Sequence, residues 1–282
     1  MGNIGNPIKQ LKGCCDKGSK VQGLHHLKLY LARFGYLNYQ HTPNHTNVED
    51  DKFDDELESA LKSYQKYYHL NATGTLDEAT VSLMVMPRCG QPDKDKETHN
   101  HGSKLLHTVS HYTFFKDNPR WPPGKSHLTY AFASNYPNNH VPPVVRAFNQ
   151  WASATGYFTF SQVDDFMGAD ITISFERGNH GDGLNFDGAG NVDGADNVLA
   201  HAFAPTDGRL HFDADDTFSD GPGAVQNVMD LESVAVHEIG HLLGLDHSDD
   251  VNASMYAYIP IGVEKGLNSD DIQGIKDLYG LN

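Results

Sequence analysis

Two histidines four positions apart constrain the fold of this chain more than any other feature. They belong to a stretch that reads Val-Ala-Val-His237-Glu238-Ile-Gly-His241-Leu-Leu-Gly244-Leu-Asp246-His247. If residues 231–243 form a helix, His237 and His241 lie on one face of it and Glu238 projects beside them. The spacing therefore predicts a helix that directs two imidazoles at one metal ion.

A third ligand is available directly after this helix. Gly244 can adopt the left-handed conformation that ends a helix and turns the chain, which brings His247 toward the first two histidines. Three histidines leave one position of a tetrahedral zinc site open for water, and zinc lowers the pKa of such a water to about 7. Glu238 is then placed to take the proton and pass it to a leaving amine. The stretch predicts a catalytic zinc site with Glu238 as general base.

Length and composition limit the number of domains and the kinds of molecule that this chain can bind. A length of 282 residues predicts about two domains, and 38% hydrophobic residues are enough to form ordinary cores. The formal net charge of −16 argues against nucleic acid, because no basic stripe is present to neutralise phosphates. No apolar run has the length of a membrane helix, and residues 1–20 lack the apolar core of a signal peptide. Cys14 and Cys15 are adjacent and bridge poorly, so no disulfide framework is expected.

The first third of the chain has the pattern of a small helical bundle. Apolar residues at helical spacing predict three helices, which begin at Val21, span residues 57–68 and run from Thr75 to Leu83. Thr75 and Glu78 form a T-x-x-E capping box at the start of the third helix. Residues 1–20 are expected to be irregular. The polar tract 94–104 has no apolar residue to bury, and it marks the expected domain boundary.

Beyond this tract the apolar period changes to that of strands. The five expected strands cover residues 127–133, 157–163, 169–176, 198–204 and 210–213. A helix opened by Pro142 and Pro143 separates the first two strands, and a last helix is expected over 269–279. The element order predicts an α+β domain with a twisted sheet.

Two motifs resemble the matrixin (matrix metalloproteinase) family of the metzincin superfamily. The extended histidine motif, followed by Met255-Tyr256, is similar to a metzincin zinc site with its Met-turn, in which the methionine lies beneath the zinc histidines. Pro87-Arg88-Cys89-Gly90-Gln91-Pro92-Asp93 resembles the PRCGxPD cysteine switch of matrixin propeptides. The resemblance implies a catalytic domain with a mostly parallel five-stranded sheet and three helices, preceded by a three-helix, peptidoglycan-binding-like propeptide. As in the plant matrixins, no haemopexin domain is expected.

The resemblance also implies how the chain is divided and kept inactive. Residues 1–93 correspond to the propeptide, 94–104 to a linker that contains the activation cleavage, and 105–282 to the catalytic domain. In the latent form Cys89 is expected to occupy the open zinc position, because a thiolate is a good zinc ligand and excludes water. Arg88 and Asp93 match the family pair that holds the loop by an ion pair.

A second zinc and a calcium ion are implied as well. Three histidines and one aspartate form the closed tetrahedral set that suits a structural zinc, and the residues that match the family ligands are His180, Asp182, His201 and His211. Asp213 and Asp216 match two acidic calcium ligands. A six-residue near-repeat leaves the third calcium ligand open between Asp187 and Asp193, and the FDGxG context of Asp187 favours it.

The motifs predict a monomeric zinc endopeptidase that is made as a latent zymogen. The family resemblance implies that it acts on extracellular proteins such as those of the extracellular matrix. One alternative is a cell-wall glycan-binding module, formed by the bundle, with the metal domain as a passenger. Another is a proteolytically inactive regulator. The intact Glu238 and Cys89 favour the protease, because neither alternative needs a general base together with a switch cysteine.

Overall fold

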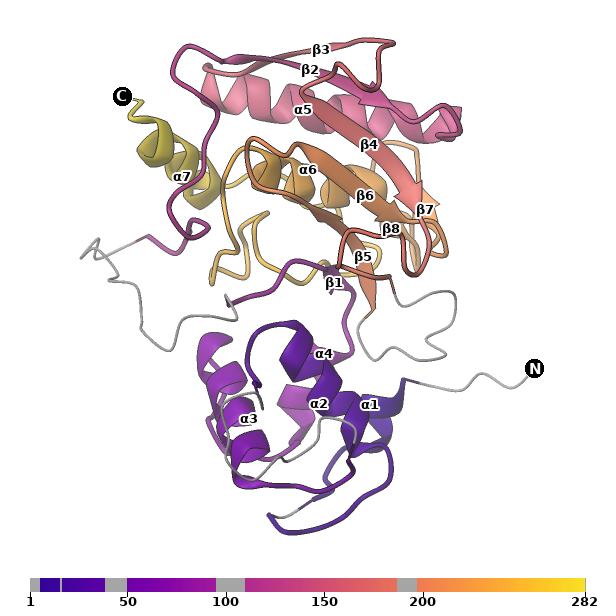
Figure 1. Cartoon of the computed structure of the whole chain (residues 1–282), viewed down its shortest axis with the longest axis vertical. Helices are drawn as coiled ribbons and strands as arrows, with labels where there is room; N and C mark the ends of the chain where they lie inside the picture. The colour runs from indigo at the N-terminus through magenta and orange to yellow at the C-terminus, as the bar shows by residue number, and fades with distance from the viewer. Residues whose placement is uncertain (1–5, 16, 39–49, 95–109, 187–196, 282) are drawn as a thin grey trace. The chain divides into compact units, whose positions relative to one another are not determined.

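The computed structural model describes residues 6–15, 17–38, 50–94, 110–186 and 197–281. The chain divides into two compact units, Met1–Lys104 with Asp187–Val198, and Leu105–Phe186 with Leu199–Asn282. Figure 1 shows helices in the first unit, and a sheet with three long helices in the second.

The first unit is helical, as the apolar spacing predicts. Its described helices are α1 (Pro7–Gln10), α2 (Leu24–Arg33), α3 (Asp55–Tyr67) and α4 (Glu78–Met84). The expectation that residues 1–20 are irregular is wrong for the single turn α1, which Asn6 caps by accepting a hydrogen bond from the Ile8 amide. This turn contacts α2 and α4 and buries Ile8 completely.

The capping box predicted at Thr75 and Glu78 is also wrong. Helix α4 begins at Glu78, and its N-cap is Asp77, whose side chain accepts a hydrogen bond of 2.9 Å from the Thr80 amide. Glu78 is therefore the first helical residue, whereas a capping box needs it at the third. Aspartate and threonine cap helices comparably well, so their order along the chain did not reveal which of them would do so.

Cys14 and Cys15 form a disulfide, contrary to expectation. Such a bridge between neighbours requires an unusual backbone, and Cys15 has a φ of 82°, in the left-handed region. The pair follows α1 directly, where the Cys14 amide donates to the Leu11 carbonyl. The bridge closes no larger loop, so it does not cross-link the helices.

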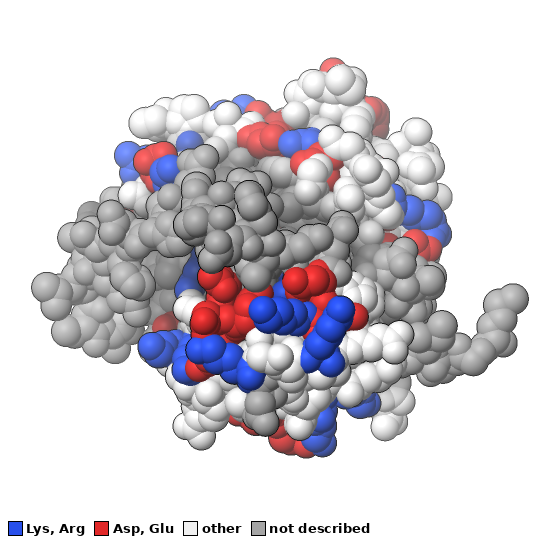
Figure 2. Space-filling model, turned by 60° about the horizontal axis from the view of Figure 1, so that its bottom comes forward, with Lys and Arg blue, Asp and Glu red and all other residues white. Residues whose placement is uncertain are grey.

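Charges of both signs lie close together on the surface of the helical unit. Figure 2 shows Lys and Arg side chains next to Asp and Glu side chains on this face. Lys17 pairs with Asp55, and Lys62 pairs with Glu58 one helical turn away. These groups are solvated and screened, so they contribute little to stability.

The second unit contains the mostly parallel sheet that the family resemblance implies. Its strands lie in the order β5-β6-β4-β2-β3, with bounds β2 (His127–Phe132), β3 (Thr159–Gln162), β4 (Ile171–Glu176), β5 (Val198–Ala202) and β6 (Arg209–Asp213). The pairs β2–β3, β2–β4 and β4–β6 are parallel, and β5 runs antiparallel to β6. Two further strands that the sequence did not reveal, β7 (Phe218–Ser219) and β8 (Met229–Asp230), form a small parallel sheet.

Three long helices accompany this sheet, α5 (Val141–Thr155), α6 (Leu231–Leu242) and α7 (Ser269–Tyr279). Helix α6 packs against α5 and β6, and nearly all of its residues are buried (Figure 1). Two buried indoles from other segments hold α6 in place. Trp151 Nε1 donates to the Val236 carbonyl at 2.8 Å, and Trp121 Nε1 donates to the Leu242 carbonyl at 2.9 Å. The helix that carries the histidine motif is thus held rigidly in the core. Among the described residues, no helix has both the length and the apolarity to cross a membrane.

Candidate metal centre

Helix α6 places His237 and His241 one turn apart on the same face, as the spacing predicts. Both side chains are fully buried, and their Nε2 atoms are 3.1 Å apart. Two ring nitrogens at this distance can both bind one metal ion through their lone pairs.

His247 reaches the same place through the turn at Gly244. This glycine has a φ of 104°, and a Cβ atom added to it would lie 2.4 Å from the Pro119 carbonyl oxygen. Only glycine therefore fits here without a shift of the backbone. The ligand atoms of His237, His241 and His247 all lie within 4.8 Å of one another. The structure brings together the three histidines predicted for the catalytic zinc.

Backbone carbonyls fix which nitrogen of each helical imidazole carries the proton. His237 Nδ1 lies 2.7 Å from the Ser254 carbonyl oxygen, and His241 Nδ1 lies 2.8 Å from that of Leu245. A carbonyl can only accept, so each Nδ1 donates and each Nε2 keeps its lone pair for a metal. Burial lowers the pKa of both histidines well below the ordinary value. Neutral imidazole is the form that binds metal.

Met255, predicted to lie in a Met-turn, packs against the helix that carries His237 and His241. Met255 is fully buried, and its sulfur packs against the backbone of α6 at Gly240, where an added Cβ would lie only 2.2 Å from Sδ. Glu238, also fully buried, follows His237 on α6. The thioether thus supports the turn of helix that carries both histidines.

Asp271 joins helix α7 to the Met-turn. Its carboxylate accepts hydrogen bonds from the backbone amides of Ser254 at 2.9 Å, Met255 at 3.0 Å and Asn268 at 2.8 Å. Because the Ser254 carbonyl orients His237, Asp271 acts on a histidine of the site through one peptide group. The sequence showed Asp271 only as an acid in the first turn of a helix. The N-x-x-D pattern with Asn268, which forms a capping box in the structure, is the local signal for its inward orientation.

A buried ammonium lies on the same side of α6. Lys265 donates its backbone amide to Ser233 Oγ at 2.7 Å, and its Nζ lies 5.3 Å from the centre of the Tyr256 ring. Burial lowers the pKa of Lys265 to about 8. No sequence pattern singled this lysine out.

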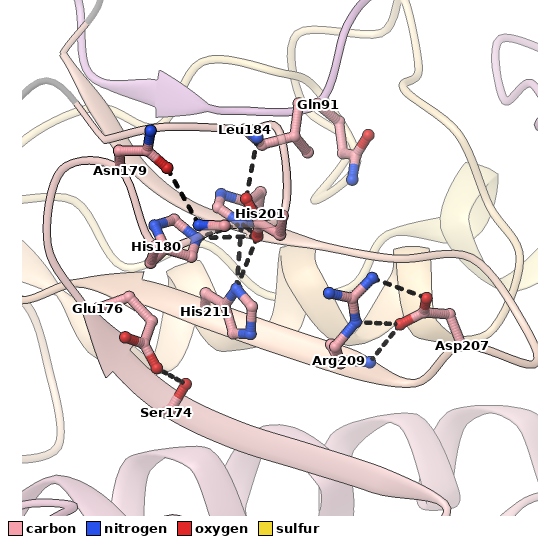
Figure 3. A network of polar contacts seen from close by, with 12 residues as sticks. Gln91, Ser174, Glu176, Asn179, His180, Leu184, His201, Asp207, Arg209 and His211 are labelled. Atoms are coloured by element: carbon pink, nitrogen blue, oxygen red, sulfur yellow. Dashed lines mark hydrogen bonds and ion pairs between the residues drawn. The ribbon is translucent and has the colours of Figure 1, made fainter.

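The second predicted metal cluster is also assembled. His180 comes from the loop after β4, His201 from β5 and His211 from β6 (Figure 3). Asp182 belongs to the same loop as His180. The Asp182 Oδ2 atom lies 2.8 Å from His180 Nε2, 2.7 Å from His201 Nε2 and 2.9 Å from His211 Nδ1. Four donor atoms that surround one point match the closed tetrahedral set expected of a structural site.

The ionisation of this cluster suits a divalent cation. Burial lowers the pKa of His201 to about 3. Burial alone would raise the pKa of Asp182, but the Leu184 amide and the His201 imidazole lower it well below the usual range. His201 therefore offers a neutral imidazole at neutral pH, and Asp182 offers a carboxylate. The nitrogen–nitrogen separations of 3.2 and 3.4 Å are close to the edge of about 3.3 Å of a tetrahedron with zinc–nitrogen bonds of about 2.0 Å.

The predicted calcium ligands are described only in part. Asp213 ends β6 and is 2% exposed, and the Asp216 amide donates to its carbonyl oxygen at 3.3 Å. Asp187 and Asp193 both lie outside the described residues. The choice between them stays as the sequence left it.

The switch motif lies in the first unit, where Arg88 and Cys89 form the short strand β1 (Arg88–Cys89). The expected ion pair is present, because Arg88 Nη2 lies 2.6 Å from Asp93 Oδ1 and both side chains are buried. Cys89 is buried, and its sulfur accepts a hydrogen bond of 3.4 Å from the Gln91 amide. Of the predicted linker, only Lys94 lies among the described residues.

Comparison with known proteins gives the same family. The family model described as Matrixin matches residues 120–280, and the one described as "Putative peptidoglycan binding domain" matches residues 21–84. Metalloendoproteinase 1 of Glycine max is 44% identical over 94% of this chain and 84% of its own length. Metalloendoproteinase 5-MMP of Arabidopsis thaliana is 44% identical over 99% of this chain and 77% of its own length. Human matrilysin is 36% identical over 89% of this chain and 83% of its own length. The chain therefore belongs to the matrixin family of zinc metalloendopeptidases.

Proposed function

We propose that this protein is a latent zinc endopeptidase in which His237, His241 and His247 hold the catalytic zinc and Glu238 is the general base. The observation that carries the proposal is the convergence of three buried imidazoles on one point. Two of them are held in the metal-binding tautomer by carbonyl acceptors. A helix that merely contained histidines would not need this arrangement.

The residues of the chain supply positioning and proton transfer. Zinc, when bound, supplies a Lewis acid that polarises the scissile carbonyl and acidifies a water molecule. Glu238 takes a proton from the attacking water and delivers it to the leaving nitrogen, so that the peptide bond breaks with a neutral amine as product. Met255 and Asp271 hold the helix and the turn that orient His237.

Latency is proposed to come from Cys89. The PRCGxPD motif and the buried Arg88–Asp93 pair support the assignment, because they give the loop around this thiol a fixed shape. A thiolate in the open zinc position excludes water, and cleavage in the linker 94–104 would release it.

Two further ions are proposed. The donor set of His180, Asp182, His201 and His211 fits a structural zinc, and its observed contacts support this assignment. Asp213 and Asp216, together with Asp187, are proposed to bind calcium in the same loop region, as hard oxygen ligands do.

We also propose that the protein works outside the cell on protein substrates, including those of the extracellular matrix. The Cys14–Cys15 disulfide supports an oxidising compartment. The match of residues 21–84 to a peptidoglycan-binding model favours a second candidate, glycan binding by the helical unit. A pull-down of the full chain on insoluble cell-wall glycan tests it.

Cleavage of a quenched fluorescent peptide tests the main proposal. Activity should require removal of the propeptide, disappear with a zinc chelator and return with zinc. Replacing Cys89 with Ser should make the uncut chain active. The Glu238→Gln variant should keep its zinc but cleave the peptide at least about 100-fold more slowly. Glu264→Gln, a matched change at an exposed position, should behave as the parent. Full activity of Glu238→Gln would refute the assigned base.

A further inference from the structure

The carboxylate of Asp93 is held by more than the arginine that the motif supplies. Its Oδ2 atom accepts a hydrogen bond from the Tyr36 hydroxyl at 2.8 Å and from the Tyr68 hydroxyl at 2.7 Å. Arg88 donates from Nη2 to Oδ1 at 2.6 Å and from Nη1 to Oδ2 at 3.3 Å. A buried carboxylate with four donors is strongly fixed, because each donor replaces water that burial removed.

Arg88 connects this carboxylate to the switch cysteine. Its Nε donates to the Cys89 carbonyl oxygen at 3.0 Å, and its guanidinium carbon lies 3.4 Å from the centre of the Phe34 ring. The arginine side chain is completely buried. Any movement of Asp93 must therefore be transmitted to the peptide of Cys89.

The two phenols come from the ends of two helices that are far apart in the sequence. Tyr36 lies just beyond the end of α2, and Tyr68 is the C-cap of α3. The ring of Tyr64 lies between them, with its centre 5.3 Å from that of Tyr36 and 4.9 Å from that of Tyr68. Burial, reinforced by the charge of Asp93, raises the pKa of Tyr36 well above its ordinary value, so its phenol remains a donor at any physiological pH.

The loop beyond Asp93 is held at the same helix end. A Cβ atom added to Gly35 would lie 2.1 Å from the Lys94 carbonyl oxygen, so the chain passes directly against this glycine. Lys94 Nζ donates to Ser63 Oγ on α3 at 2.7 Å. Residues near the ends of α2 and α3 thus contact both Asp93 and Lys94, the last residues of the loop that follows Cys89.

We propose that Tyr36 and Tyr68 are positioning residues for Cys89, so that the strength of latency is set at the junction of α2 and α3. Separating these helix ends withdraws both phenols from Asp93 and loosens the Arg88 bridge to Cys89. The loop around Cys89 then opens more often with the chain uncut, so the frequency of this opening depends on the two phenols. The inference rests on the proposed role of Cys89 in latency.

The test uses the full-length zinc-loaded chain and measures how fast a small thiol reagent modifies Cys89. Hydrogen bonds to a charged group shift an opening equilibrium by about 10- to 100-fold, so Tyr36→Phe and Tyr68→Phe should each accelerate the modification by about tenfold or more. The double variant should fall short of the product of the two, because both phenols share one oxygen. Tyr157→Phe, on the second unit, is the matched control and should react like the parent.

A second measurement separates local opening from general loss of stability. The modification rate of each variant is followed at low urea, well below global unfolding measured by circular dichroism. Local opening exposes little surface, so the accelerated rate should depend weakly on urea. If Tyr68→Phe does not fold, Tyr36→Phe carries the test alone.

Two results would overturn the inference. One is an unchanged rate of thiol modification in folded tyrosine variants, and the other is an acceleration with the urea dependence of global unfolding. Failure of the switch itself is distinguishable, because a Cys89→Ser chain would then stay latent whatever the tyrosine variants show.

Discussion

Replacing Asp271 with Ala should destabilise the catalytic unit and weaken its zinc site together. The change leaves three backbone amides without their carboxylate acceptor, and a hydrogen bond to a charged group contributes about 1.5–3 kcal/mol. The contributions of the three hydrogen bonds are not fully additive. Burial disfavours the charged carboxylate, as the raised pKa of Asp271 indicates, and this cost offsets part of their sum. We therefore expect a loss of about 3–5 kcal/mol, which lowers Tm by about 10 °C in a domain of this size.

The effect on zinc follows from the Ser254 peptide. The Ser254 carbonyl accepts from His237, and the amide of the same peptide group, that of Met255, donates to Asp271. Loss of such an outer contact lowers metal affinity by about 10- to 100-fold. Competition with a fluorescent chelator gives the affinity, and thermal unfolding by circular dichroism gives Tm. Asp270→Ala is the matched control, because Asp270 accepts from the His111 amide and Ser248 Oγ and not from the Met-turn. Equal zinc affinity in the two variants would refute the reasoning.

Three further changes test other parts of the site. Glu238→Gln should keep zinc but lower kcat by about 100-fold or more, since it loses the general base; elemental analysis beside peptide kinetics checks this. His241→Ala should lose the catalytic zinc, because two ligands hold it poorly, and an unchanged zinc count would exclude His241. Lys265→Met removes an ammonium whose pKa is about 8 in the fold and about 10.4 when unfolded. Because the pKa is lower in the folded state, the folded chain loses its proton first as pH rises. The free energy of unfolding of the parent should therefore increase by up to about 3 kcal/mol between pH 8 and pH 10.5. Urea unfolding at pH 7 and pH 10 should show this gain in the parent and not in the variant.

The sequence predicted the catalytic unit well because its long elements carry a strong periodic signal. Helices α5 and α7 and the five strands lie where apolar spacing places them, and α6 lies where the histidine spacing places it. Strands β7 and β8 have two residues each, too few for any alternation to show. The turn α1 was missed for the same reason, since its four residues contain one buried side chain.

The histidines of both metal clusters could be predicted because local spacing and family motifs identify them. The contacts that hold them in place could not, since they join distant positions. Tyr36 is 57 residues from Asp93, and Asp271 is 17 from Ser254. Tyrosine in an apolar helix pattern indicates core packing, and aspartate at a helix start indicates a cap. Only the folded chain shows that these side chains also hold the switch loop and the Met-turn.

The tie between α7 and the Met-turn has a consequence for the order of events during synthesis. The ribosome releases the helical unit first, and local contacts such as those of α2 and α3 form quickly. Asp271 lies far downstream of the helical unit, so the peptide that orients His237 stays unanchored until long after that unit has emerged. The segment proposed to inhibit the protease can therefore be folded before the protease becomes competent. If Cys89 confers latency as proposed, a nascent chain has no interval in which an active enzyme precedes its own inhibitor.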